Sequence, residues 1–177
     1  GLGDMYSNGE GVTEDDKEAV KWYRLAADQG NAPAQFNLGL MYDNGEGVLE
    51  DDKEAVKWYR LAADQGAAPA QYNLGIKYDN GEGVLQGHNE AVWWYRKAAE
   101  QGVADAQYNL GIKYSTSQGV LQNFVTAYAW INIAEANGRD VKRFKELLNG
   151  NITLNQIAKS QELAKEMIQK NPKLINK

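Results

Sequence analysis

A period of 36 residues runs through most of this chain and restricts what it can fold into. Leu38, Leu74 and Leu110 are each 36 residues apart, and Leu2 extends the series toward the start. The same step relates sets of glycines, tyrosines and tryptophans: Gly3, Gly39, Gly75 and Gly111; Tyr6, Tyr42, Tyr78 and Tyr114; Trp22, Trp58, Trp94 and Trp130. A fixed period of this length is typical of architectures in which identical units stack on one another. We therefore predict four copies of one structural unit.

Each copy has the pattern of two helices joined by short turns. In the second copy, Ala34, Leu38 and Tyr42 are spaced i, i+4, i+8 and form one apolar stripe of a first helix. The second helix opens with an Asp51-x-x-Glu54 pattern, a variant of the capping box that satisfies free N–H groups. Glycines follow both helices, where they can adopt positive φ. Because the connections are short, we expect antiparallel neighbouring helices.

Three motifs within the period resemble a known family. They read Ala-x-Ala-Gln-[Phe/Tyr]-Asn-Leu-Gly, Tyr-x-x-Gly-x-Gly-Val and Ala-Val-x-Trp-Tyr-x-x-Ala-Ala-x-x-Gly, and together they cover residues 1 to about 138. This set resembles the Sel1-like repeat (SLR) family, a relative of the tetratricopeptide repeat. The resemblance implies an all-α fold, an α/α superhelical solenoid that recognises partners, usually proteins or peptides. The cysteine-free copies are similar to the bacterial members.

The period predicts the domain organisation. We place four units at residues 1–30, 31–66, 67–102 and 103–138, followed by a helical cap at 139–177. The cap is indicated by a Thr153-x-x-Gln156 capping box, which Ile152 and Ile157 flank as a hydrophobic staple. A polar-faced terminal helix of this kind covers the last repeat of a stack.

The two terminal copies depart from the pattern. In the fourth copy Ser117 replaces the first loop glycine, as expected for an atypical terminal repeat. The first copy aligns Gly1 with Asn37, so its first helix begins partway through the unit. We therefore expect the natural chain to extend upstream of Gly1. The compartment stays open, with a bacterial periplasmic or secreted protein, its signal peptide removed upstream, as the alternative.

Charge and composition exclude several classes of partner and site. Residues 1–138 carry 10 basic and 20 acidic side chains, whereas residues 139–177 carry 9 basic and 4 acidic ones. An acidic surface repels phosphate backbones, so we expect no nucleic-acid partner. The chain has no cysteine and no apolar run near the roughly 20 residues that span a bilayer. We expect neither disulfides nor a membrane span, and the oligomeric state stays open.

No pattern in the sequence indicates catalysis or a cofactor. His88 is the only histidine, at the start of a second helix, so a two-histidine metal site is impossible. The Gly45-Glu46-Gly47 turn lacks the third glycine of a phosphate-binding loop, and it follows a helix instead of a strand. We therefore expect a non-enzyme without a catalytic residue, metal or cofactor.

A row of residues on the first helices is the candidate partner-binding site. Asn37, Met41 and Asn44 share one side of their helix, away from the apolar stripe. The equivalent residues in the next copies are Asn73, Lys77 and Asn80, then Asn109, Lys113 and Thr116. First helices line the concave surface of tetratricopeptide-type solenoids, so the resemblance implies that this row faces a groove.

The row allows two interpretations. Asparagine amides can both donate to and accept from the backbone of an extended peptide, and the lysines suit an acidic side chain. Alternatively, Asn37, Asn73 and Asn109 bond neighbouring repeats to each other.

Trp93 completes the candidate set. It stands where earlier copies have Lys21 and Lys57, on the polar side of its helix. An indole there is either a partner contact or a packing contact against the next repeat, and tryptophan is enriched in binding hot spots. The chain is therefore predicted to be a non-catalytic scaffold that binds a protein or peptide through its concave groove. The alternative is a cell-envelope protein that binds or acts on peptidoglycan fragments.

Overall fold

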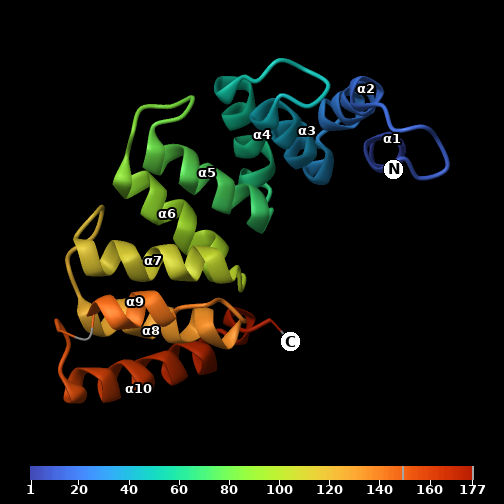
Figure 1. Ribbon diagram of the computed structural model, residues 1–177. Coiled ribbons are helices and arrows are strands. Elements are labelled where there is room, and N and C mark those ends of the chain that lie inside the picture. Colours follow the sequence, from blue (N-terminus) through green and yellow to red (C-terminus); the bar gives the residue numbers. More distant parts are fainter. Residues whose placement is uncertain (149, 177) are drawn as a thin grey trace. The chain divides into compact units, whose positions relative to one another are not determined.

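The structure, a computed structural model, describes residues 1–148 and 150–176, and these residues form helices and no strand (Figure 1). The predicted all-α fold is confirmed. The helices are α1 (Leu2–Asn8), α2 (Asp16–Ala27), α3 (Ala32–Asn44), α4 (Asp52–Asp64), α5 (Ala68–Asn80), α6 (His88–Ala99), α7 (Ala104–Thr116), α8 (Phe124–Ala136), α9 (Lys142–Leu148), α10 (Leu154–Lys170) and the 3₁₀ turn η1 (Pro172–Leu174).

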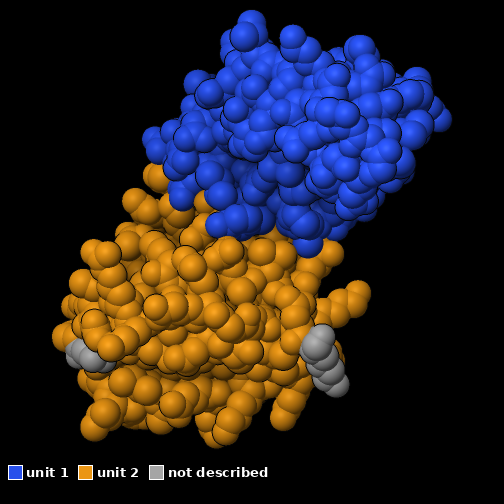
Figure 2. All heavy atoms as spheres, turned by 45° about the vertical axis from the view of Figure 1, so that its right-hand side comes forward, with its two compact units in different colours: residues 1–86 blue, residues 87–177 orange. Residues whose placement is uncertain are grey.

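The chain divides into two compact units (Figure 2). Unit 1 spans residues 1–86 and holds α1 to α5, while unit 2 spans residues 87–177 and holds α6 to α10. The division falls between the first and the second helix of the third 36-residue copy. Each unit is therefore described by itself.

The second helices begin as their capping pattern predicts, although only half of the pattern is used in α4. The Asp51 carboxylate accepts hydrogen bonds from the backbone N–H groups of Lys53 and Glu54, at 2.9 and 3.1 Å. The Glu54 side chain does not accept a hydrogen bond from the backbone N–H of Asp51, which a complete capping box would require. Its carboxylate accepts from Lys57 and from the indole N–H of Trp58, at 3.0 Å each. Glu54 thus supports the buried Trp58, which is 4% exposed as predicted for the interior.

The repeated glycine of the first helix sets how closely its partner helix can approach. A Cβ built on Gly39 would lie 2.6 Å from the ring of Tyr59 on α4, too close for any side chain. Tyr23 of α2 lies against Gly3 in the same way. A buried aromatic ring therefore fills the place of a missing methyl group in both helix pairs of unit 1.

Buried glutamines connect consecutive copies. The side-chain N–H of Gln35 donates to the carbonyl of Ala27 at 3.1 Å, and its carbonyl accepts from Gln65 at 2.7 Å. Gln71 donates to the carbonyl of Ala63 at 3.1 Å. Gln35 and Gln71 are each 4% exposed. These amides satisfy backbone carbonyls at the C-terminal ends of the second helices, which have no partner within the helix.

Unit 2 ends in helices that cover its apolar surface. In Figure 1, α8 lies between α7 and α10, and it packs against both. A core cluster joins α8 to the cap: Tyr128, Ile131, Ala134, Val141, Phe144, Leu148 and Ile152, with Ile157 packed against it. The capping box before α10 is confirmed, because Thr153 and Gln156 exchange side-chain to backbone hydrogen bonds at 2.9 and 3.3 Å.

The side-chain amides of Gln107 in α7 and of Asn137, directly after α8, bind the last described turn of the chain. The carbonyl of Leu174 accepts from Gln107 at 2.8 Å and from Asn137 at 2.7 Å. Asn137 also donates to the side-chain carbonyl of Gln107 at 2.8 Å. The Asn137–Gln107 pair has the same 30-residue separation as the Gln65–Gln35 pair of unit 1.

Candidate functional site

Two hollows of equal size lie along the first helices of unit 1. The first hollow is a cavity of about 270 Å³ lined by Asp4, Ser7, Asn8, Tyr23, Asn37, Leu40, Met41 and Glu46. The second hollow, also about 270 Å³, is lined by Asp43, Asn44, Asn73, Ile76, Lys77 and Glu82. Each residue of the second hollow follows a member of the first by 36 positions. The two are one site in consecutive copies, and we call the surface that holds both the first-helix face.

The second hollow contains a buried amine surrounded by carboxylates. The Lys77 side chain is 7% exposed, and its Nζ bonds to Asp43, to Asp52 at 2.7 Å and to Glu82 at 3.0 Å. Burial alone would lower the pKa of Lys77, but the hydrogen bonds that its ammonium donates to these three carboxylates outweigh burial and raise the pKa above its ordinary value. Lys77 is therefore a charged residue that joins α5 to the start of α4.

A tyrosine orders one carboxylate of the same hollow. The Tyr59 hydroxyl donates to Asp43 Oδ2 at 2.9 Å. Burial and the negative charge of Asp43 raise the pKa of Tyr59, whereas a hydrogen bond from Asn73 acts in the opposite direction. Asn73 therefore contacts a residue of the preceding copy, as the second interpretation of the asparagine row expects.

The first hollow repeats this arrangement with a different carboxylate. Ser7 replaces the aspartate equivalent to Asp43, and Asp4 of α1 takes its role. Asp4 Oδ1 accepts from the Tyr23 hydroxyl at 2.9 Å and from the Asn37 amide at 3.2 Å. Burial and the bond to Asp4 raise the pKa of Tyr23 to about 12.

The exposed asparagines of the row hold glutamates at the rim of the hollows. The Asn44 amide donates to Glu46 at 3.1 Å, and the Asn80 amide donates to Glu82 at 3.0 Å. In these pairs the glutamate side chain is oriented within the same loop, two residues beyond the asparagine.

The middle position of the row is buried, contrary to the expectation that the whole row faces the partner. Met41, Lys77 and Lys113 are 3%, 6% and 4% exposed. Met41 belongs to the core of unit 1, and the Lys113 amine donates to Gln118 at 3.0 Å in unit 2. The helical wheel places these residues on the correct side of the helix, but the loop of the same copy folds over them. For Lys77, the charge predicted for an acidic partner is matched by the chain itself.

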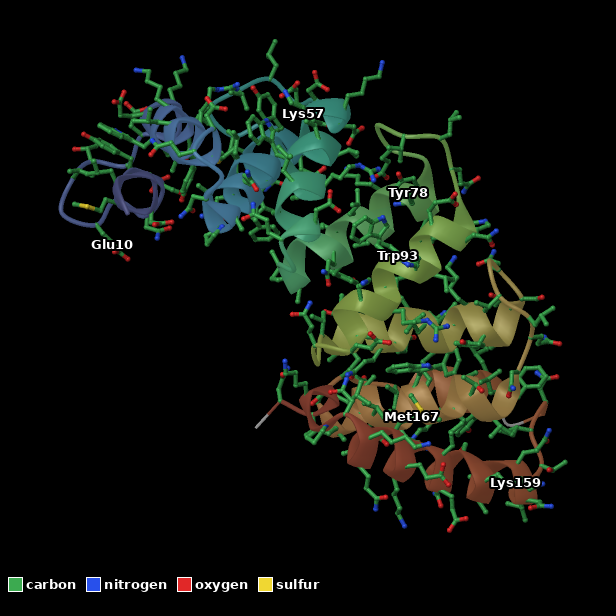
Figure 3. The ribbon with its side chains drawn as sticks, turned by 180° about the vertical axis from the view of Figure 1, so that it is seen from behind. Glu10, Lys57, Tyr78, Trp93, Lys159 and Met167 are labelled. Carbon is green, nitrogen blue, oxygen red and sulfur yellow. The ribbon has the colours of Figure 1, made fainter. Side chains whose placement is uncertain are left out.

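In unit 2, Trp93 is exposed as predicted, and Asn109 is half-buried. Trp93 of α6 is 50% exposed and labelled in Figure 3. Its ring meets that of Trp94 edge-on with centroids 4.3 Å apart, and Lys97 Nζ lies 4.9 Å from its centroid. The indole thus has intramolecular neighbours and an open side.

The interpretation of the sequence missed two repeated features. The first is the set of buried glutamines that connect copies. The second is a leucine in the loop of each of three copies: Leu49, Leu85 and Leu121 are about 90% exposed. The 36-residue spacing of these residues was a signal for both features.

Two larger cavities are present, and the first of them shares Asp4, Tyr23 and Asn37 with the first hollow. One of about 680 Å³ borders Gly1–Asp4 and Tyr23. The equivalent tyrosine of the next copy, Tyr59, is covered by Phe36 of α3, with ring centroids 5.9 Å apart. The other, of about 470 Å³, lies between α7, α8 and α9 and includes Tyr108 and Phe144.

Neither a membrane span nor a metal cluster is found in the part of the chain that the structure describes. No helix there is long and apolar enough to cross a bilayer. No group of three or more histidine, aspartate or glutamate side chains there is placed to hold a metal ion.

Comparisons with known proteins agree with the repeat pattern. The model of the Sel1 repeat matches residues 1–31, 32–66, 68–103 and 104–138. A solved Sel1 repeat protein from Oxalobacter formigenes is 34% identical, with a TM-score of 0.79 over 99% of this chain and 72% of that one. No curated protein matches the chain.

A second solved structure is c5321, a protective antigen present in uropathogenic Escherichia coli strains that displays an SLR fold. It is 30% identical, with a TM-score of 0.63 over 98% of this chain. This chain spans 45% of that structure, which is less than half of its length. Neither comparison supports the cell-envelope enzyme alternative.

Proposed function

Because the chain belongs to the Sel1 repeat family, we propose that it is a non-catalytic scaffold that binds a protein or peptide partner through its first-helix face. Sel1 repeats are protein-interaction modules, and the copies cover residues 1–138. A repeated surface suits an extended partner because equivalent positions recur at a fixed spacing.

The observation that carries this proposal is the pair of equivalent hollows. Each combines carboxylate and amide groups with one aliphatic side chain, Leu40 in the first and Ile76 in the second. Polar groups that converge on a hollow beside an apolar contact are typical of sites that fix the orientation of a ligand. The asparagines take part on either interpretation, since Asn37 and Asn73 bond across copies and also line the hollows.

The test compares two double variants of the full chain as baits for affinity capture. Leu40→Arg with Ile76→Arg places a large charged group in both hollows. Leu25→Arg with Leu61→Arg is the matched control, because these residues have the same 36-residue spacing but lie exposed on the second helices α2 and α4. Circular dichroism melts establish that both baits are folded.

We expect the first double variant to lose a captured protein that wild type and the control retain. Removing a contact at the centre of an interface costs about 2 kcal/mol or more, which is a loss of about 30-fold in affinity. Retention by the Leu40/Ile76 variant, with loss by the Leu25/Leu61 variant, would place the partner on the second helices and refute the proposal.

A further inference from the structure

The second hollow shows what its carboxylates bind. Asp43, Asp52 and Glu82 surround a primary amine, and that amine is supplied by the chain itself as Lys77. The lysine stem is buried between the two copies, so only the ammonium meets polar groups. This hollow is a lysine site that is already occupied.

The first hollow keeps two of the three acceptors in the same local setting. Asp16 and Glu46 stand 36 residues before Asp52 and Glu82, whereas Ser7 stands in the place of Asp43. Gly47 lies so close to the backbone of Asp16 that it has no room for a side chain, and Gly83 contacts Asp52 in the same way. Asn44 holds Glu46 as the equivalent asparagine holds the glutamate of the second hollow. The loop and the start of the second helix are therefore placed alike in both copies.

The first hollow lacks the amine. Met41 occupies the position of Lys77, and a methionine side chain follows the lysine stem to the ε position without carrying an ammonium. In the described part of the chain, Asp16 and Glu46 form no ion pair. Asp4, the third carboxylate of this hollow, accepts hydrogen bonds from the Tyr23 hydroxyl and the Asn37 amide. Two carboxylates thus remain without a cation.

We propose that the first hollow binds the side-chain amine of a lysine from the partner, which takes the place that Lys77 fills in the second hollow. The inference rests on the proposed function and names the chemistry of its partner: a lysine-bearing segment of a protein. The charge of unit 1 favours such a segment, because residues 1–86 hold 7 basic and 16 acidic side chains. This reverses the expectation of an acidic partner that was based on the lysines of the row.

The test uses full-length protein labelled with ¹⁵N and a peptide with one lysine, acetyl-Gly-Ser-Lys-Ser-Gly-amide. A second peptide has norleucine in place of lysine, which keeps the stem and removes the amine. We expect the lysine peptide to shift the NMR signals of the Asn37 and Asn44 side-chain amides. The norleucine peptide leaves them unchanged, since an ammonium is what the carboxylates bind.

Two opposite variants, each with a control of equal charge, distinguish binding at the hollow from a general effect of the net charge of the protein. Met41→Lys supplies an internal amine and should weaken binding of the lysine peptide about tenfold or more. Leu49→Lys is the matched control: it adds the same charge at a loop residue that is 90% exposed, and we expect a change of about threefold or less. Lys77→Met empties the second hollow, so the peptide should newly shift Asn73 and Asn80, whereas Lys57→Met should not produce these shifts.

Glu46→Gln tests the same site without altering the core, in case a variant at position 41 does not fold. It should weaken the lysine peptide about tenfold, while Glu50→Gln, with the same charge change in the same loop, should not. Equal binding of the two peptides, or equal weakening by Glu46→Gln and Glu50→Gln, overturns the lysine site. If the Leu40/Ile76 bait still loses its partner in that event, the scaffold proposal stands and only this inference fails.

Discussion

Ser117 has the only positive φ, 61°, among the described residues other than glycine. It ends α7 at the position where Gly9, Gly45 and Gly81 end the earlier first helices. A side chain in this left-handed conformation costs about 1 kcal/mol. We expect Ser117→Gly to raise the free energy of unfolding by about 0.5–1 kcal/mol in urea denaturation. Thr116→Gly, one residue earlier in helical conformation, should lower it, and a gain from both would refute the argument.

Tyr23 links stability to alkaline pH. Its folded pKa of about 12 lies above the value of about 10 for an unfolded chain, so the native state holds the proton more tightly. The resulting stabilisation is complete below pH 10 and is lost as pH rises toward 12. Tyr23→Phe should cost about 1 kcal/mol at pH 8, because the bond to Asp4 is lost. Urea denaturation at pH 8 and pH 11 should show this cost shrinking, and a constant difference would contradict the assignment.

For single residues, the sequence predicted which side chains are buried in the core better than it predicted which side chains of the candidate site are exposed. Leu38 and Trp58 are buried as their spacing indicates, because helical periodicity determines which side faces the neighbouring helix. Lys77 was misplaced because its partners Asp43 and Asp52 lie 34 and 25 residues away, on other elements. The role of Asp4 has no counterpart in the other copies, so no repeat pattern could reveal it.

Between elements, buried glutamines are the connection that can be tested most directly. Gln35→Leu removes two buried hydrogen bonds: the one to the Ala27 carbonyl, which keeps the backbone N–H of Gly30, and the one from Gln65. We expect a loss of about 1–2 kcal/mol in the free energy of unfolding. Gln29→Leu is the control, because this exposed side chain, two residues after α2, bonds only the carbonyl of Leu25 in the same copy. Its effect should stay within about 0.5 kcal/mol, and equal losses would remove the glutamines from the connection.

The elements after residue 138 should act as a cover for α8. Deleting residues 139–177 exposes Tyr128 and Ile131, which pack against Phe144 and Leu148 of α9. We expect a lower melting temperature and increased binding of the dye ANS, because apolar surface becomes accessible. A truncated protein that stays monomeric by size-exclusion chromatography and melts with wild type would show that these helices do not cap the stack.

The helices and most of their ends could be predicted because capping residues and glycines act locally. Thr153 and Asp51 cap the helices they precede. Glu54 could not be placed, since two donors on its own helix compete for it with the cap backbone. The hollows were also beyond prediction, because each requires side chains from two copies and the loop that folds over them.

For the whole molecule, charge is distributed unequally. Residues 1–86 hold 7 basic and 16 acidic side chains, and residues 87–177 hold 12 basic and 8 acidic ones. A lysine-bearing partner should therefore associate with unit 1 faster at low ionic strength. Stopped-flow measurement should show the association rate falling about tenfold between about 0.05 and 0.5 M salt. The rate for a neutral norleucine analogue should hardly change, and equal salt dependence would exclude electrostatic steering.

The hydrogen bonds of Gln107 and Asn137 to the Leu174 carbonyl limit where 36-residue repeats can be gained or lost in evolution. Gln107 and Asn137 bond the backbone of the final turn, so the last copy and the tail recognise each other by direct hydrogen bonds. The tail also bonds the carbonyls of Glu100 and Gly102, so duplication or loss of a 36-residue block before position 100 leaves that recognition intact. The same event between Asn137 and Leu174 breaks it. Blocks can therefore be added or removed ahead of this segment without breaking its bonds, and homologues with different copy numbers should keep residues 100–176 together.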